Sequence, residues 1–284
     1  MIDLLTYPFF LRALGAAVVT SIICGIVGSY MVSRRIVFIG GGITHASFGG
    51  IGIGHYLGFN PIAGAVIFAL VTAISIETLS EKMKMRMDTL IGIMWAFGMA
   101  AGIIFIYITP GYTPNLMTYL FGNILTVSTE YLLIFSLVAL VVVLLFVVLF
   151  KEILWISFDE EFARVQQLPV TLLKYLILGI VSIAIVFAIR IVGIILIISL
   201  ITIPQATASL FIKSFRGMIV YSILFSLVAG IFGLFASYSL NIPSGPAIIF
   251  ISVLIFIVLK IIVVIYNRST VNKNISNHRE LAGK

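Results

Sequence analysis

Long apolar runs separated by short basic segments dominate this sequence of 284 residues. About 20 apolar residues, rising about 1.5 Å each along a helix, cross the hydrocarbon layer of a bilayer. The runs cover residues 9–33, 36–58, 62–79, 90–108, 131–150, 175–189, 191–211, 218–240 and 247–266. The sequence therefore predicts an all-α, polytopic transmembrane helical protein.

The number of spans is eight or nine, because the run at 175–189 is short and only Arg190 separates it from the next run. All basic residues except Arg12 and Arg190 fall on one side of a nine-span arrangement, or within snorkelling reach of it. Basic loops are typically cytoplasmic. The alternation favours nine spans over eight, with the N-terminus outside and the C-terminus in the cytoplasm.

Composition agrees with a membrane protein, since 62% of the residues are hydrophobic and 10% are charged, against about 25% charged in soluble proteins. The net charge of +7 lies in loops between spans, which indicates topology and excludes a nucleic-acid partner. We expect a transmembrane domain over 1–266, with a cytoplasmic loop at 151–174, and a polar cytoplasmic tail over 267–284.

The second run is rich in glycine. Small residues recur there at every fourth position, namely Gly42, Ala46, Gly50 and Gly54. Residues four apart share a helix face, and small residues let neighbouring helices approach closely in lipid. The pattern predicts a helix-packing stripe. Packing alone, and packing that permits sliding between two arrangements, are both consistent with it.

His45 lies within the same run. An ionisable residue inside a span is costly and is a candidate for a transport path. The alternative is a neutral imidazole bonded to a neighbouring carbonyl group. His55 follows ten residues later, about 15 Å further along the helix, so the two imidazoles cannot share one ion.

Motifs of catalysis are absent from the sequence. It contains no G-x-x-x-x-G-K-[ST] phosphate loop and no H-E-x-x-H, and no G-x-S-x-G surrounds Ser47. We therefore expect neither a catalytic site nor a stably bound cofactor in this chain.

The loop at 151–174 reads KEILWISFDEEFARVQQLPVTLLK. Its acidic residues 159–161 suit the first turn of a helix. Phe158, Phe162 and Val165 recur at helical spacing and form one apolar face. This face could pack on the chain's own spans or on lipid headgroups, or it could dock on a soluble partner.

Six stretches carry a resemblance to a known family. They are RRIVFIGGGITHASFGGIGIG, DTLIGIMWAFGMAAGI, YLFGNILTVS, ISFDEEFARVQQLPV, RIVGIILIISLITIPQATA and SYSLNIPSGPAIIF. In this order they resemble the membrane permease subunits of the zinc/manganese/iron ABC-importer family. The resemblance implies a type II ABC importer-like permease in the plasma or inner membrane, which moves a divalent transition metal into the cytoplasm by alternating access. It implies as partners a second copy of the chain, an ABC ATPase subunit that hydrolyses ATP, and an extracellular or periplasmic solute-binding protein.

The resemblance also assigns residues. The ATPase-coupling segment corresponds to Phe158, Asp159, Glu160, Glu161, Phe162, Ala163 and Arg164. The family's histidine in the glycine-rich span is His45, which becomes the candidate metal ligand of the translocation path. Many members have an aspartate where this chain has Gly41, and another where it has Asn241, whose carbonyl oxygen could still bind a metal. Gln167 stands where the family usually has glycine.

Three other functions remain alternatives. A permease for a metal chelate, such as a siderophore or corrinoid, would need no side-chain ligand, and the two missing aspartates agree with it. An intramembrane enzyme lacks a catalytic constellation in this sequence. The acidic loop argues against a passive channel or a scaffold.

Overall fold

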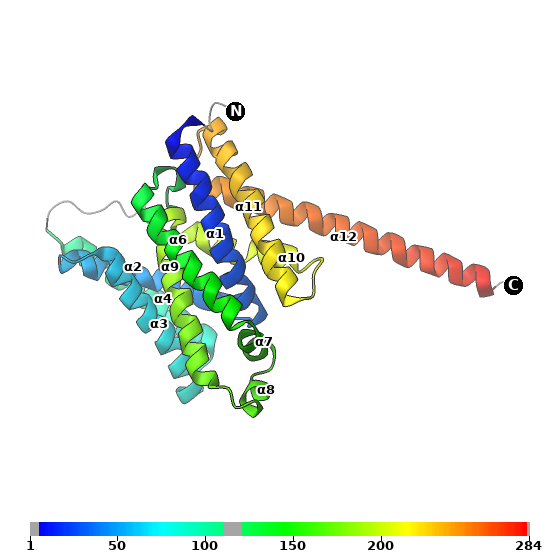
Figure 1. The fold of residues 1–284 in the computed structure, drawn as a ribbon, viewed down its shortest axis with the longest axis horizontal. Helices are drawn as coiled ribbons and strands as arrows, with labels where there is room; N and C mark the ends of the chain where they lie inside the picture. Colours follow the sequence, from blue (N-terminus) through cyan, green and yellow to red (C-terminus); the bar gives the residue numbers. More distant parts are fainter. Residues whose placement is uncertain (1–5, 111–120, 283–284) are drawn as a thin grey trace.

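Helices joined by short turns make up the part of the chain that the computed structural model describes, residues 6–110 and 121–282. Eight of these helices are long and apolar enough to cross a membrane (Figure 1). They are α1 (Pro8–Ser33), α2 (Val37–Tyr56), α3 (Pro61–Met83), α4 (Met87–Ile108), α6 (Thr129–Val148), α9 (Val170–Leu200) with α10 (Ile203–Ala208), α11 (Phe215–Leu240) and α12 (Ser244–Ala282). The short helices are η2 (Ile124–Thr126), α7 (Phe150–Phe158) and α8 (Glu160–Val165). The prediction of an all-α transmembrane protein is confirmed.

Several spans begin at residues that cap the first turn of the helix. The side chain of Asn60 accepts a hydrogen bond of 2.9 Å from the backbone of Ile62, and Pro61 occupies the first turn of α3. Ser128 caps α6 by accepting a hydrogen bond of 3.2 Å from the backbone of Tyr131. Such caps satisfy backbone N–H groups that the helix leaves without a partner.

The runs at 175–189 and 191–211 fall within one of the eight candidate spans, which consists of α9 continued by α10. A bend divides this span where Gly193 adopts φ 82° and ψ 164°, so each run keeps its own helical arm, and the choice between eight and nine spans depends on whether the two arms are counted together. A positive φ is accessible to glycine at no steric cost. The backbone of Gly122 packs directly against Gly193, so a side chain at either position would collide with main chain.

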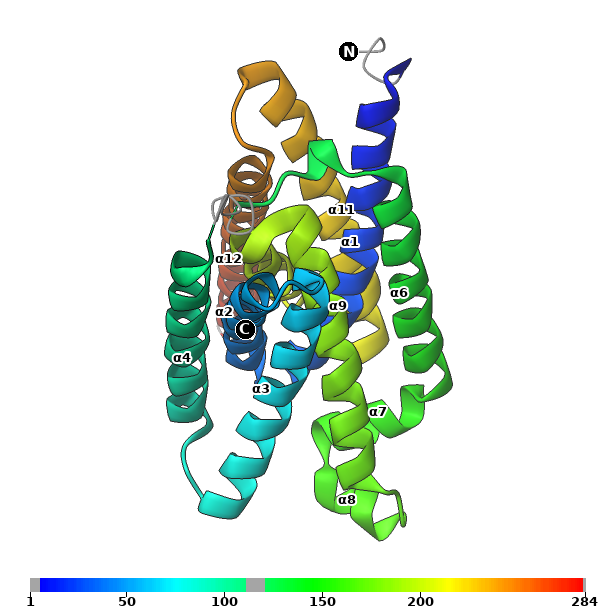
Figure 2. The ribbon, with the colours of Figure 1, turned by 90° about the vertical axis from the view of Figure 1, so that its left-hand side faces the viewer.

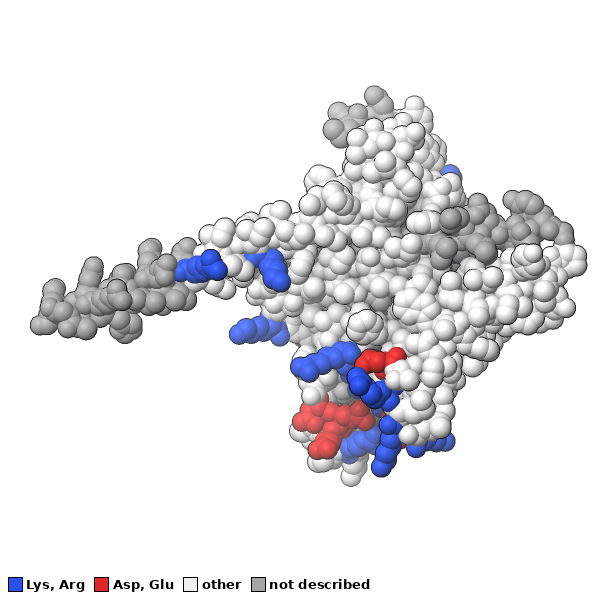
Figure 3. All heavy atoms as spheres, turned by 180° about the vertical axis from the view of Figure 1, so that it is seen from behind, with Lys and Arg blue, Asp and Glu red and all other residues white. Residues whose placement is uncertain are grey.

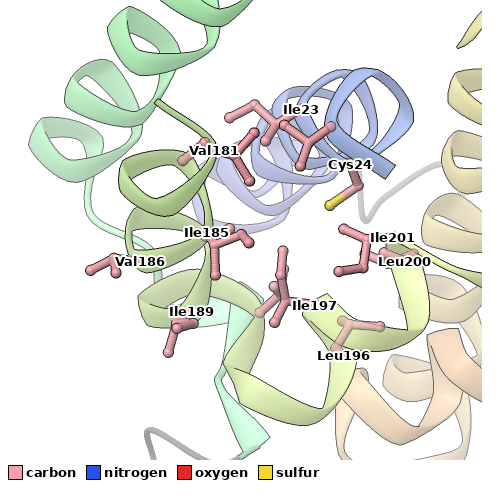
Figure 4. Packing of buried hydrophobic residues seen from close by; sticks show 14 of the residues in the cluster. Ile23, Cys24, Val181, Ile185, Val186, Ile189, Leu196, Ile197, Leu200 and Ile201 are labelled. Carbon is pink, nitrogen blue, oxygen red and sulfur yellow. The ribbon is translucent and has the colours of Figure 1, made fainter. Parts of the chain in front are cut away.

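The two arms of α9 run in opposite directions from this bend. The first arm starts beside the end of α3, where Lys174 pairs with Glu77. The second arm returns toward the end of α1, where Ile201 lies against Gly28. Figure 4 shows side chains of both arms converging on α1; they are Val181, Ile185, Ile197, Leu200 and Ile201, around Ile23 and Cys24.

Helix α2 lies at the centre of one half of the bundle, enclosed by α3, α4 and α9 (Figure 2). In its most apolar stretch 78% of the residues are buried, against 11% in α12. Its small residues make this enclosure possible, because a Cβ atom at Gly50 would collide with the backbone of Gly64 in α3, and one at Gly98 of α4 with the backbone of Ala46.

The four-residue stripe of α2 therefore serves two neighbours rather than one. Gly50 approaches α3, and Gly54 adjoins Pro61 at the start of α3. Gly42 and Ala46 face α4, through Ile91 and Gly98 respectively.

Charged side chains gather at one end of the bundle, as Figure 3 shows. We call this the charged end; it comprises α7, α8, the end of α3 and the start of α9, with Glu77, Glu81, Glu160 and Lys174. The starts of α1 and α6 lie at the opposite end (Figure 2). Helix α12 packs on α11, α10 and α9 and then extends away from the other helices (Figure 1).

A matched pair of substitutions tests the glycine contacts. Gly50→Ala should lower the thermal stability of the purified chain by about 1–3 kcal/mol, because the new methyl group must displace the backbone of α3. Gly92→Ala should be neutral or stabilising by up to about 1 kcal/mol, because a Cβ at Gly92 of α4 meets nothing within 4 Å and alanine favours a helix over glycine. Equal melting temperatures for the two variants would contradict the contact.

Candidate functional site

The acidic segment at the charged end forms two short helices rather than one. Asp159 interrupts the helix with φ −149° and ψ 92°, and its Oδ1 accepts a hydrogen bond of 2.8 Å from the backbone of Phe162. Phe158 therefore ends α7, whereas Phe162 and Val165 belong to α8. The expectation that these three side chains share one helix face is wrong, because Asp159 caps a new helix between them.

The apolar side chains of this segment have different neighbours. Phe158 packs edge-on against Phe215 of α11, with ring centres 6.2 Å apart, and Phe162 packs edge-on against Trp155, at 5.8 Å. Both stay exposed, Phe158 at 64% and Phe162 at 43%. Together with Val165, at 77%, they leave an apolar surface open at the charged end.

One face of α8 is anchored on the bundle. Ala163 is completely buried, in a small cluster with Ile156, Val170 and Leu173. Of the seven predicted coupling residues, Ala163 thus faces inward, and Glu160 is engaged in ion pairs. Phe158, Asp159, Glu161, Phe162 and Arg164 are exposed.

Lys174, near the start of α9, is the centre of a network of ion pairs. Its Nζ lies 2.7 Å from Oε1 of Glu77 and donates a hydrogen bond of 2.7 Å to Oε1 of Glu81, both in α3. The same Nζ lies 3.6 Å from Oε2 of Glu160 in α8. Arg34, after α1, lies 3.7 Å from that carboxylate oxygen and donates a hydrogen bond of 2.7 Å to the backbone carbonyl of Ile156. The network joins α8 to the ends of α1, α3 and α9.

The pairs in this network differ in energetic weight. The side chains of Lys174 and Glu77 are 8% and 6% exposed, so removing one leaves a buried charge without a partner, which typically costs about 3–5 kcal/mol. The pair of Arg164 with Glu160 is 2.8 Å long but its side chains are 55% and 31% exposed, and such surface pairs contribute about 0–1 kcal/mol. The attachment of α9 to α3 depends chiefly on Lys174 and Glu77.

The protonation of Glu160 responds to this setting. Partial burial acts to raise the pKa of the Glu160 carboxyl, but the hydrogen bond from Arg164 and the charges of Lys174 and Arg34 outweigh it and hold the pKa below its usual value. A lowered folded-state pKa means that the pairing contributes its full stability above the unfolded pKa of about 4.3. The contribution is lost as the pH falls through the lower, folded-state pKa.

The Lys174 network was not predicted from the sequence. A signal was present, since Glu77 and Glu81 lie four residues apart and therefore share a helix face. Two acidic side chains on one face at the end of a span require a cation from another element. The pattern does not say which of the basic residues on the same side supplies it.

His45 stacks on Trp95 of α4, with ring centres 3.9 Å apart and planes at 11°. The stack occupies the face of the imidazole and leaves the in-plane nitrogen positions free. Nδ1 is buried and has no hydrogen-bond partner. A metal ion binds an imidazole through a ring nitrogen, and Nδ1 of His45 is not already engaged by a hydrogen bond.

Gly41 lies one helical turn before His45. A Cβ atom at this position would meet Trp95 at 3.8 Å and Ile198 at 3.9 Å, which are ordinary contact distances. The site therefore has room for a side chain beside His45. Glycine at this position is not required by packing, in contrast to Gly50.

Asn241 lies on a different part of the fold from His45. It ends α11 in the left-handed conformation, with φ 52° and ψ 44°, which asparagine tolerates better than most residues. Helix α11 packs on α1, α10 and α12, whereas α2 packs on α3, α4 and α9. Among the side chains that the structure describes, in residues 6–110 and 121–268, no group of three His, Cys, Asp or Glu residues comes together as a metal cage.

Comparisons with known proteins extend over nearly the whole chain. The model of a family described as the ABC 3 transport family matches residues 6–263. An uncharacterised membrane protein of Synechocystis is 38% identical over 258 residues, which cover 91% of this chain and 92% of that protein. The manganese transport system membrane protein MntC of Listeria monocytogenes is 33% identical over 255 residues, covering 90% and 91%. The solved structure of PsaBC from Streptococcus pneumoniae in complex with Fab contains a chain with a TM-score of 0.82 and 34% identity, covering 91% of this chain and 93% of that one.

Substitution of Lys174 tests the ion-pair network. Lys174→Met should destabilise the purified chain by about 3–5 kcal/mol, because it leaves the buried carboxylate of Glu77 unpaired. The double variant Lys174→Met/Glu77→Gln should recover part of that loss. Lys151→Met, at an exposed lysine of α7, is the control and should melt with the wild type; a Lys174→Met variant that also did so would refute the assignment.

Proposed function

The chain belongs to the ABC 3 transport family, as its motifs indicated, and we propose that it is the permease subunit of an ABC importer for a divalent transition metal, with manganese as cargo. The single observation that carries the proposal is its 33% identity, over 90% of its length, to a manganese transport system membrane protein. The fold, a multi-pass bundle of apolar helices, supports it.

We propose His45 as the ligand that the metal meets within the membrane. The support is the stack on Trp95, which fixes the plane of the ring, together with the unpartnered Nδ1. Nε2 of His55 is unpartnered as well, so the stack is the feature that sets His45 apart. A single imidazole binds a divalent metal weakly and selects poorly among transition metals. Weak binding suits conduction, because an ion held in a full cage would leave slowly. Selection for manganese would then fall to the solute-binding protein.

We propose that a separate ABC ATPase binds to α8 and the end of α7. The charged end would then form the cytoplasmic face of the permease. The support is an exposed apolar surface, from Phe158, Phe162 and Val165, with Glu161 beside it. The buried Ala163 and the ion pairs of Glu160 hold this surface firmly to α3 and α9. Movement imposed on α8 by nucleotide binding would therefore be transmitted to the spans.

The remaining parts of the proposal concern the assembly. Two copies would form the path, the ATPase would hydrolyse ATP, and a solute-binding protein would deliver the metal on the outer side. The complex would lie in the plasma or inner membrane with the C-terminus of this chain in the cytoplasm. The small-residue contacts of α2 with α3 and α4 would be the surfaces that slide during alternating access.

Replacement of His45 tests the metal path. His45→Ala should lower the uptake of radioactive manganese, by cells that express the complete importer, about 10- to 100-fold or more. Loss of a residue that only supports a metal ligand already weakens a metal site by this factor. His55→Ala, on the same helix near its other end, is the matched control and should retain wild-type uptake. Unchanged uptake in His45→Ala, or uptake only of a metal chelate, would contradict the assignment.

The room at Gly41 provides the converse test of the same path. Gly41→Asp places a carboxylate one turn from the imidazole, on the same helix face, and should tighten manganese binding to the purified chain. The double variant Gly41→Asp/His45→Ala should lose this gain. A Gly41→Asp variant that folds and binds manganese no more tightly than the wild type would show that His45 does not face the path.

Loss of the aromatic ring in α8 tests ATPase docking. Phe162→Ala should reduce co-purification of the cognate ATPase by about tenfold or more. Truncation of an aromatic anchor at an interface commonly costs about 2 kcal/mol or more of binding free energy. The melting temperature of the permease itself should change little, because Phe162 is 43% exposed. Phe59→Ala, just before the start of α3 and remote from the charged end, is the control; an intact complex with Phe162→Ala would refute the docking site.

A further inference from the structure

A cavity of about 620 Å³ opens on the side of the bundle between α3, α6 and α9, away from the His45 site. Its volume lies within the range of about 300–1,000 Å³ that is typical of small-molecule sites. The starts of α3 and α6 border it at Asn60 and Ser128, and the exposed Arg190 of α9 also lines it. None of the functions proposed above uses this cavity.

Two opposite charges line the cavity without pairing with each other. The guanidinium group of Arg190 lies over the ring of Tyr131, 4.4 Å from its centre, and Glu130 is the first acidic residue of α6. Within the described residues, neither side chain has an ion-pair partner. An arginine in an apolar helix is costly unless a partner compensates its charge.

The walls between these charges are apolar and face outward from the bundle. Ile67 of α3 and Ile134 of α6 border the cavity and are 59% and 42% exposed. Both lie within two turns of the starts of their spans, so the apolar part of the cavity continues along the first turns of α3 and α6. A ligand for it needs a polar head with both charges and an apolar body.

We propose that this cavity binds a zwitterionic phospholipid with a primary amine, such as phosphatidylethanolamine. The phosphate oxygens accept charge-assisted hydrogen bonds from Arg190, whose planar fork matches a phosphate group. The ammonium group of the lipid donates to the carboxylate of Glu130, and the acyl chains lie along Ile67 and Ile134. An anionic lipid lacks the partner for Glu130 and places two negative charges in one cavity.

Native mass spectrometry of the full-length chain tests this site by titration with palmitoyl-oleoyl phosphatidylethanolamine or palmitoyl-oleoyl phosphatidylglycerol. The wild type should bind the ethanolamine lipid more tightly. Arg190→Gln should weaken binding of both lipids by about tenfold or more, whereas Glu130→Gln should abolish the preference between them. Lys260→Gln, which removes a cation of α12 far along the chain, should bind like the wild type.

Each outcome supports or overturns the proposal. Equal binding of the two lipids by the wild type, or unchanged binding by Arg190→Gln, overturns it. Soluble phosphoethanolamine should not displace the lipid, because it lacks acyl chains; displacement at equal concentration would make this a site for free phosphate compounds. If Arg190→Gln fails to fold, the Glu130→Gln variant, at an exposed residue, still tests the proposal. A Glu130→Gln variant that keeps the preference for the ethanolamine lipid would refute the pairing of the lipid ammonium group with Glu130.

Discussion

The arrangement of the spans depends on one constraint, which is the close main-chain contact of α2 with α3 and α4. Apolar surfaces have no hydrophobic drive to associate in lipid, so close packing must supply the attraction. Gly50 against Gly64, and Ala46 against Gly98, bring the helices near enough for their main chains to touch. This packing brings α2 and α4 together where His45 stacks on Trp95. The helix that carries the candidate ligand is therefore also the helix around which half of the bundle is assembled.

The ion pairs of Lys174 connect this apolar assembly to the exposed helix α8. Apolar contacts alone would let α8 separate from the spans, since only Ala163 of that helix is buried. The carboxylates of Glu77 and Glu81 hold Lys174 against α3, and Glu160 attaches α8 to the same ammonium group. Burial makes the inner pair difficult to break, whereas the outer pairs are partly hydrated and can rearrange. A rigid inner ion pair with more adaptable outer pairs would suit the coupling role proposed for α8.

The sequence alone predicted the helical class, most span starts to within a few residues and the position of the acidic segment, but not that α12 continues as a helix to Ala282. It did not predict the bend at Gly193, because a glycine in an apolar run is equally consistent with a straight helix. It placed Phe158 and Phe162 on one helix, because periodicity does not reveal that Asp159 ends α7 and caps α8. The network of Lys174 depends on contacts between distant segments, which spacing along the chain cannot show. Gln167 has φ 59°, a left-handed conformation that favours glycine, so the backbone agrees with the glycine that the resemblance led us to expect there and gives no reason for the glutamine.

The central claim is that this chain moves metal only when a separate ATPase acts on it through α8. The most direct measurement is the accumulation of manganese in sealed proteoliposomes that contain the chain together with its ATPase and solute-binding protein. The account predicts accumulation against a gradient when ATP reaches the side of α8, and none when the ATPase is left out or Phe162 is replaced by alanine. Manganese entry through the chain alone, without ATPase or ATP, would contradict it.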